Sequence, residues 1–207
     1  MQILYQDKHM LVVNKPSGLL SQPGSLDDSV VHRLEKLYPF VGQVHRLDQS
    51  TSGVMVYGLN KKAQSNLSIQ FQDRQTFKVY EAVVYGSLPC PTGQIDLPIR
   101  CDWPNRPRQE IHQEGRQALT HWQRLPNTKK PAIPDNCTRI RLIPHTGRSH
   151  QLRIHMAAMG FPIIGDYFYA EGKAFELASR LNLHAKSLYL NHPVTGQRMF
   201  FESEAPF

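Results

Sequence analysis

The sequence predicts an α+β fold in which helices and loops flank a mixed, largely antiparallel central sheet. Strand-length runs of apolar residues are the most frequent pattern along the 207 residues, and several alternate between polar and apolar positions as half-buried strands do. Three longer segments instead repeat their apolar residues every three or four positions, as amphipathic helices do. This mixture of many strands and few helices is typical of helices packed against one sheet.

The first half of the chain alternates strands with two capped helices. Asp28 or Ser29 is expected to cap a helix that runs to about Tyr38, and Asn60 to start a second helix that runs to about Asp73, since short polar side chains satisfy the first free N–H groups of a helix. The predicted strands of this half are residues 3–5, 10–13, 54–57 and 77–86.

The second half begins with a segment rich in Pro, Arg and Gln, residues 89–134, for which one strand, 118–125, and long irregular connections are predicted. A helix capped near Ser149 and closed by Gly160 follows a strand at 138–143. His150 and Arg153 share one face of this helix because they are three residues apart. Its expected buried residues are Leu152, Met156 and Met159, and the last predicted strands are 188–190 and 199–201.

Length and composition indicate one compact domain or two small lobes, with ample chain to bury a core. We expect residues 1–207 to form a single domain. No apolar run approaches the roughly 20 residues that cross a bilayer, and the polar N-terminus does not resemble a signal peptide. The three cysteines include no CxxC pair, which favours a reducing cytoplasm over a disulfide framework or a zinc site. We therefore expect a cytoplasmic protein without a membrane partner.

The positive charge is concentrated in one quarter of the chain. Residues 100–153 hold eleven Lys or Arg and four acids, a surplus of seven that equals the net charge of +7 for the whole chain. Such a surplus suits a polyanion, because every neutralised phosphate releases counterions. A solvated basic surface is the alternative, but the aromatic and glutamine residues interleaved here favour nucleic acid.

Three motifs carry the functional prediction. His45-Arg46-Leu47-Asp48-Gln49-Ser50-Thr51-Ser52-Gly53 places one carboxylate in a polar loop before an apolar strand, Lys78-Val79-Tyr80 follows, and Thr146-Gly147-Arg148-Ser149-His150-Gln151-Leu152-Arg153 comes later. Together they resemble the motifs of the RluA family of RNA pseudouridine synthases. The resemblance extends from Ile3 to Phe207 and includes Asn14-Lys15-Pro16-Ser17-Gly18. It implies the pseudouridine synthase catalytic fold, here without the S4 RNA-binding domain that many members carry.

The resemblance assigns Asp48 as the catalytic aspartate, Arg153 as the arginine that pairs with it, and Tyr80 as the residue that stacks on the target base and acts in C5 deprotonation. The reaction breaks a glycosidic C–N bond, turns the uracil and joins C5 to C1′. It consumes no water and transfers no net electrons, so no cofactor and no metal are expected. One carboxylate, one cation to keep it ionised and one group near the base suffice. The carboxylate acts as a nucleophile, at C1′ or at the uracil ring, or it stabilises charge that develops on the sugar.

RNA contacts are expected from further residues. By resemblance, Arg46 fills the gap left when the uridine flips out, which is necessary because C1′ and C5 are out of reach within a stacked helix. His45, together with His150, is expected to support the Asp48 loop and to lie on the substrate side. The remaining predicted RNA-binding residues are Arg148, Trp103, Arg106 and Arg108.

The segment from Cys101 to Gln109 is most similar to a short, dual-specific branch of the family that acts on a 23S rRNA hairpin loop and on the tRNA anticodon stem-loop. Structured RNA of these two kinds is therefore the expected partner of a monomer without an obligatory protein partner. Two alternatives remain open. A non-catalytic RNA-binding or remodelling protein would use the same basic face, and a nucleobase glycosylase would release free uracil, although retaining glycosidases use two carboxylates.

Overall fold

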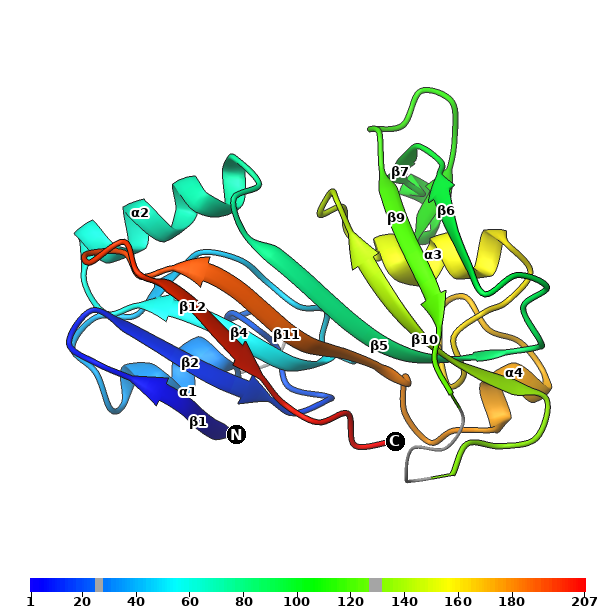
Figure 1. The fold of residues 1–207 in the computed structure, drawn as a ribbon, viewed down its shortest axis with the longest axis horizontal. Helices are drawn as coiled ribbons and strands as arrows, with labels where there is room; N and C mark the ends of the chain where they lie inside the picture. The colour runs from blue at the N-terminus through cyan, green and yellow to red at the C-terminus, as the bar shows by residue number, and fades with distance from the viewer. Residues whose placement is uncertain (25–27, 127–131) are drawn as a thin grey trace. The chain divides into compact units, whose positions relative to one another are not determined.

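The computed structural model describes residues 1–24, 28–126 and 132–207. The chain divides into two compact units, residues 1–78 with 184–205 and residues 79–183 with 206–207. Figure 1 gives the labels of the helices and strands used below.

In the first unit the strands pair in the order β1-β2-β4-β11, with β3 on β4 and β12 on β11. All of these pairs are antiparallel except β4 with β11, which is parallel. Helix α2 lies along one face of these strands (Figure 1), where its Leu67 joins a core that includes Val56 and Leu188. The elements are β1 (Gln2–Gln6), β2 (Met10–Lys15), α1 (Val30–Glu35), β3 (Gly42–Gln43), β4 (Ser52–Gly58), α2 (Lys61–Gln72), β11 (Leu183–Asn191) and β12 (Arg198–Glu202).

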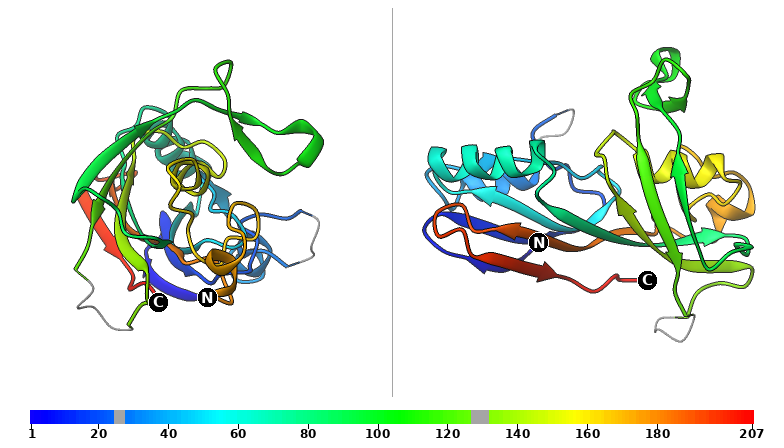
Figure 2. Two further views of the ribbon diagram at one scale, coloured as in Figure 1. Left: turned by 90° about the vertical axis from the view of Figure 1, so that its right-hand side faces the viewer. Right: turned by 45° about the horizontal axis from the view of Figure 1, so that its top comes forward.

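In the second unit the strands pair antiparallel in the order β5-β10-β9-β6. A separate antiparallel pair, β7 with β8, lies beyond one end of β6 and β9 (Figure 2). The core of this unit forms between the strands and α3, with Ala82, Ile140 and Met156 fully buried. The elements are β5 (Phe77–Tyr85), β6 (Thr92–Asp96), β7 (Ile99–Cys101), a 3₁₀ turn η1 (Trp103–Asn105), β8 (Gln109–Ile111), β9 (Leu119–Arg124), β10 (Cys137–Pro144), α3 (Gln151–Ala158) and α4 (Lys173–Glu176).

The predicted mixed, largely antiparallel sheet with flanking helices is confirmed, and so are two of the predicted helix starts. The Ser29 hydroxyl accepts from the His32 N–H at 3.1 Å, and the Asn60 side chain accepts from the Ala63 N–H at 2.9 Å. The first helix nevertheless ends at Glu35, short of the predicted Tyr38. Pro39 follows that tyrosine, and a residue before proline is driven away from helical backbone angles.

Helix α3 differs from its prediction at both ends. Its cap is His150, which adopts left-handed backbone angles with φ at 55°, so the prediction of Ser149 was wrong. Met159 was also predicted wrongly: it lies just after the last helical residue and is 39% exposed, while Leu152 and Met156 are buried. Gly160, with φ at +80°, closes the helix as expected.

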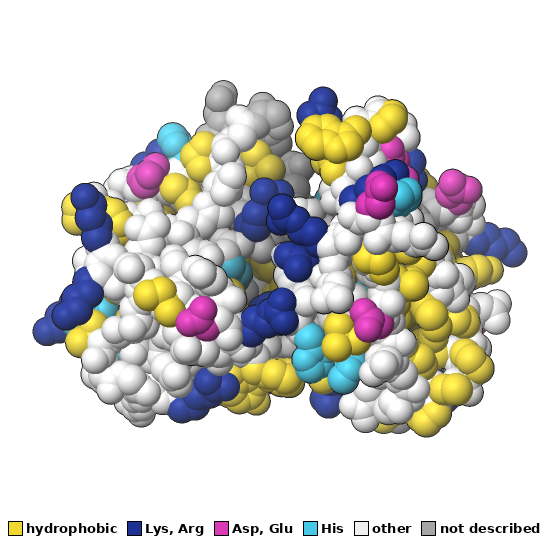
Figure 3. Space-filling view, turned by 90° about the horizontal axis from the view of Figure 1, so that it is seen from above, with side chains coloured by type: hydrophobic (Ala, Val, Ile, Leu, Met, Phe, Trp, Pro, Cys, Tyr) yellow, Lys and Arg dark blue, Asp and Glu magenta, His cyan; other side chains and the backbone are white. Residues whose placement is uncertain are grey.

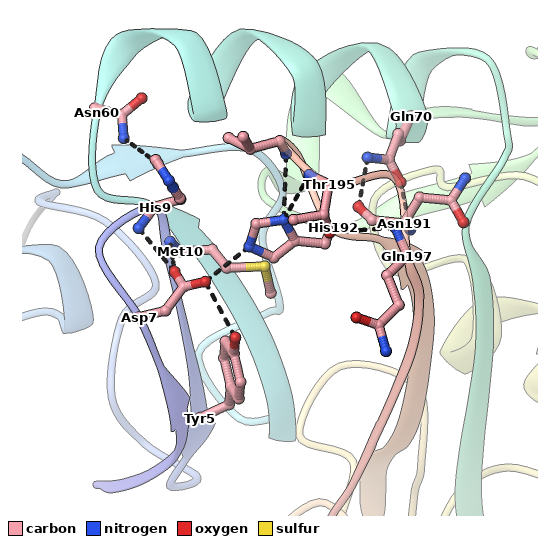
Figure 4. Close-up of polar contacts among 11 residues, drawn as sticks. Tyr5, Asp7, His9, Met10, Asn60, Gln70, Asn191, His192, Thr195 and Gln197 are labelled. Atoms are coloured by element: carbon pink, nitrogen blue, oxygen red, sulfur yellow. Dashed lines mark hydrogen bonds and ion pairs between the residues drawn. The ribbon is translucent and has the colours of Figure 1, made fainter.

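Asp7, in the turn between β1 and β2, connects that turn to the turn after β11 (Figure 4). One carboxylate oxygen accepts from the His192 Nε2 at 2.7 Å and from the Tyr5 hydroxyl at 3.1 Å, while the other accepts from two backbone N–H groups. His192 Nδ1 accepts from the Thr195 N–H at 3.0 Å. The imidazole proton therefore lies on Nε2, where it is donated to Asp7.

Candidate functional site

The loop of residues 45–53 holds Asp48 half-buried shortly before β4, a strand whose seven residues are all buried. Two hydrogen bonds join this loop to Ser21: the Leu47 N–H donates to the serine hydroxyl at 3.1 Å, and that hydroxyl donates to the Leu47 carbonyl at 2.6 Å. The Thr51 N–H closes the turn on the Asp48 carbonyl at 3.1 Å. The backbone that carries Asp48 is therefore fixed on both sides of the carboxylate.

Lys15 also supports the loop that carries Asp48, a role that was not predicted from the motifs. Its side chain is fully buried, and the ammonium donates to the carbonyls of Leu19 at 2.7 Å, Gln49 at 2.9 Å and Pro16 at 3.0 Å. The Gly18 N–H also donates to the Gln49 carbonyl, at 2.9 Å. A buried cation with three acceptors resists rearrangement, since each lost bond would leave charge without solvent. Residues 15–19 thus hold the Asp48 loop in place through hydrogen bonds.

Gly53 allows β4 to approach β11 directly after this loop. Its φ is +121°, and a Cβ there would lie 2.3 Å from the Ala185 carbonyl oxygen. Both the backbone angle and the close contact exclude a larger side chain. The glycine at the end of the motif is therefore needed to place the loop against the sheet.

His45 at the start of the loop bonds to β4. Its Nε2 accepts from the Val56 N–H at 3.1 Å, and its ring stacks on Phe71 with the centroids 4.4 Å apart. Burial, followed by the nearby Lys78 ammonium, lowers the pKa of His45 to about 3. The ring is therefore neutral at physiological pH, with its proton on Nδ1. The neighbouring Arg46 is exposed.

Tyr80 lies in β5 directly opposite Leu142 of β10. It is half-buried and packs against the core of the second unit. This placement fits ordinary strand packing, and it leaves part of the ring at the surface of the unit.

Arg153 is 2% exposed on α3, and its bidentate partner in the second unit is Asp166. Nε and Nη2 donate to the two carboxylate oxygens at 2.8 and 2.6 Å. The carboxylate also accepts from the N–H groups of Phe168 at 2.9 Å and Tyr169 at 3.2 Å. The rings of these two residues flank the guanidinium carbon at 5.2 and 5.3 Å. The plane of Arg153 is thus set from several sides.

The connection between β7 and β8, residues 102–108, is called here the 102–108 loop. Trp103 is 67% exposed on it, and the guanidinium of Arg106 lies 4.8 Å from the indole centroid. Arg108 instead turns inward: it donates to the Phe168 carbonyl and lies over the Tyr169 ring at 5.8 Å. Trp103 and Arg106 therefore present a stacking surface, whereas Arg108 anchors the loop.

Some of the basic side chains of residues 100–153 are already paired with carboxylates or buried. Arg100 pairs with Glu110 and Glu114 at 2.6 and 2.9 Å, and the fully buried Arg139 pairs with Glu81 at 2.7 Å. Lys129 and Lys130 lie outside the described residues. Figure 3 shows one face of the molecule, on which Lys and Arg side chains cover more surface than Asp and Glu. Arg148, also predicted to bind RNA, donates through Nε to the Gln117 carbonyl at 3.1 Å.

The predicted site residues fall into two groups. The first unit holds His45, Arg46 and Asp48, and the second holds Tyr80 and Arg153 with the expected RNA-binding residues Trp103, Arg106, Arg108 and Arg148. The expected pairing of Asp48 with Arg153 joins residues of different units and stays a prediction. Asp166 was not predicted from the sequence as a site residue. Its only signal was a Gly-Asp turn after Ile163-Ile164, which does not reveal the partner of the carboxylate.

Within the described ranges, no three His, Cys, Asp or Glu side chains are grouped so that they could hold a metal ion. None of the helices in those ranges is both long and apolar enough to cross a membrane.

Comparison with known proteins identifies the family. A sequence model of the RNA pseudouridylate synthase family matches residues 9–158. The dual-specificity RNA pseudouridine synthase RluA of Yersinia pestis is 50% identical over 211 residues, covering 100% of both chains. Its counterpart from Escherichia coli strain K12 is 48% identical, covering 99% of this chain and 93% of the other. The structure of human RNA pseudouridylate synthase domain containing 1 superposes with a TM-score of 0.84 at 29% identity, covering 100% of this chain and 84% of that one. These matches confirm the resemblance of the three motifs, and the chain belongs to the RNA pseudouridylate synthase family.

Proposed function

We propose that this chain isomerises specific uridines to pseudouridine in a 23S rRNA hairpin loop and in the tRNA anticodon stem-loop. Full-length identity near one half to synthases whose names state dual specificity supports two RNA classes. The observation that carries the catalytic part is the rigid loop holding Asp48, the one carboxylate of the first motif. Lys15 and Ser21 fix its backbone through the hydrogen bonds described above.

In the proposed mechanism, Asp48 acts as the nucleophile: its carboxylate bonds to the flipped-out uridine as the N1–C1′ bond breaks, and that bond is broken again before the product leaves. Arg153 keeps the carboxylate ionised and oriented. Tyr80 stacks on the uracil while it turns and acts in removal of the C5 proton after C5 joins C1′. Arg46 takes the place of the flipped base, and Trp103, Arg106 and Arg148 contact the RNA. His45 lies on the substrate side of the loop it supports.

We also propose that both units act together as a single catalytic domain, residues 1–207, that works as a monomer in the cytoplasm. No cofactor is required in this mechanism, because atoms and electrons balance within the nucleotide itself, and we propose no obligatory protein partner.

The test is tritium release from RNA labelled at uridine C5, without added metal or cofactor. Wild type, Asp48→Asn and the matched control Asp73→Asn, an exposed carboxylate at the end of α2, are compared on a tRNA anticodon stem-loop and a 23S rRNA hairpin. Release by wild type and Asp73→Asn, with none from Asp48→Asn and RNA affinity within a few-fold, is expected. Turnover by Asp48→Asn close to that of wild type excludes Asp48 as the nucleophile.

Two product measurements separate the alternatives. Free uracil in the supernatant of the wild-type reaction would identify a glycosylase. Tight binding of both RNAs without tritium release, also on total cellular RNA, would identify a non-catalytic RNA-binding protein.

A further inference from the structure

The hydroxyl of Tyr169 bridges two segments of the second unit. It accepts from the Gln109 backbone N–H at 2.8 Å and lies 2.8 Å from His150 Nδ1. Because a backbone N–H only donates, the tyrosine proton is available for the imidazole. The hydroxyl thereby links the end of the 102–108 loop to the residue that caps α3.

The ring of the same tyrosine covers Arg153. Its centroid lies 5.3 Å from the guanidinium carbon of Arg153 and 5.8 Å from that of Arg108. Its backbone N–H donates to Asp166, the bidentate partner of Arg153, at 3.2 Å. Tyr169 therefore contacts both the guanidinium and the carboxylate that orients it.

The 102–108 loop is anchored on this same segment at a second point, because Arg108 donates to the Phe168 carbonyl. Phe168 also flanks Arg153, at 5.2 Å. Outward, the loop carries the exposed Trp103 and Arg106. One short segment thus holds the loop on one side and the guanidinium on the other.

We propose that Tyr169 is a positioning residue that holds the RNA-contacting 102–108 loop through its hydroxyl and the guanidinium of Arg153 through its ring. This inference rests on the proposed function, in which Arg153 serves the reaction. The hydroxyl sets the loop so that Trp103 and Arg106 meet the RNA, and the ring keeps the guanidinium in its plane. The two parts of one side chain therefore serve different kinetic constants.

Two substitutions separate these parts. Tyr169→Phe keeps the ring and removes both hydroxyl bonds, so KM is expected to rise about three- to tenfold with kcat within about twofold of wild type. Tyr169→Leu also removes the ring, and kcat is expected to fall at least about tenfold. Tyr167→Phe is the matched control. Tyr167 is 79% exposed, so its substitution should leave both kinetic constants unchanged.

A double-mutant cycle distinguishes positioning from simple loss of stability. If the hydroxyl acts through the loop, Tyr169→Phe with Trp103→Ala raises KM no further than the worse single variant. The inference is overturned if the KM increases of the two single variants multiply in the double variant, or if Tyr169→Phe leaves KM unchanged. In either case, turnover by the wild type still supports the proposed function. No turnover by the wild type on either RNA overturns both. Thermal denaturation of each variant verifies that the compared proteins are folded.

Discussion

Arg153 and Asp166 form a buried pair in which two guanidinium nitrogens lie 2.8 and 2.6 Å from the two carboxylate oxygens. The carboxylate fixes the plane of the guanidinium and is itself held by two backbone N–H groups. A planar fork held in this way differs from a point charge in direction as well as in strength. This geometry makes Arg153 hard to replace, even by another cation.

Arg153→Lys should therefore lower kcat by about a hundredfold or more, because the ammonium cannot reproduce two parallel bonds and a flat, stacked cation. Tritium release under single-turnover conditions measures this loss. The matched control is Arg33→Lys, in the exposed pair with Asp28, which should retain wild-type turnover. Near-normal activity of Arg153→Lys would remove the arginine from the mechanism.

Asp166→Leu should cost about 3 kcal/mol of unfolding free energy, because it takes from the buried Arg153 guanidinium the carboxylate that accepts two of its hydrogen bonds. Urea denaturation followed by circular dichroism gives this value. The double variant Asp166→Leu with Arg153→Met should be more stable than Asp166→Leu alone, since it buries no charge. A double variant that is less stable than the single variant would contradict the desolvation argument.

Strongly patterned elements could be predicted from the sequence. Asn60 and the apolar spacing that follows predicted α2 almost to the residue, and the alternation after Phe77 predicted β5. The segment 89–134 was predicted poorly: beyond β9 it contains β6, β7 and β8. These strands have three to five residues, too few to show a period. β6 also pairs with β9, which lies beyond β7 and β8 in the chain.

The site shows the same division. Asp48, Tyr80 and Arg153 became candidates because the motifs that contain them resemble those of a known family. Arg153 pairs with Asp166 across a turn that has no periodic pattern. The helix was predicted to be capped near Ser149, whereas its cap is His150 in left-handed backbone angles. Tertiary contacts decide both features, so local patterns could not reveal them.

Replacing Arg106 and Arg108 together by Ala should weaken RNA binding and reduce the magnitude of the slope of log K against log salt by about 1 to 2. The slope falls because binding releases fewer counterions when the protein neutralises fewer phosphates. The structure separates their contributions. Arg106→Ala removes an exposed cation, whereas Arg108→Ala removes an anchor to Phe168. Filter binding at several salt concentrations measures the slope. An unchanged slope in the double variant would locate the RNA-binding surface elsewhere.

His45 should make the protein less stable in mild acid. Its pKa of about 3 in the folded chain lies below the value of 6.5 for the free group, so the unfolded state binds the proton more readily between these pH values. This contribution is complete above about pH 6.5 and is lost as the pH falls toward 3. His45→Gln keeps an acceptor for the Val56 N–H without a titrating ring. Urea denaturation between pH 7 and 4 should give a shallower decline for this variant, and parallel curves would contradict the assignment.

Asp7 should stabilise the first unit in a manner that disappears at low pH. Burial alone would raise its pKa, but bonds from two backbone N–H groups, His192 and Tyr5 outweigh burial and lower it from 3.8 to about 2. The folded state therefore holds the carboxylate charged more strongly than the unfolded state does. This stabilisation is present above about pH 4 and is lost as the pH falls through 2.

Asp7→Asn should therefore lower the free energy of unfolding by about 2 kcal/mol at pH 7, with the difference from wild type shrinking toward pH 2, where the wild-type carboxyl is half protonated. Asp28→Asn, at an exposed pair, is the matched control and should show little change at either pH. Urea midpoints at pH 7 and pH 2.5 provide the comparison. A deficit of equal size at both pH values would mean that Asp7 acts through the shape of the turn, because a contribution from the charged carboxylate must diminish as that carboxylate takes up a proton.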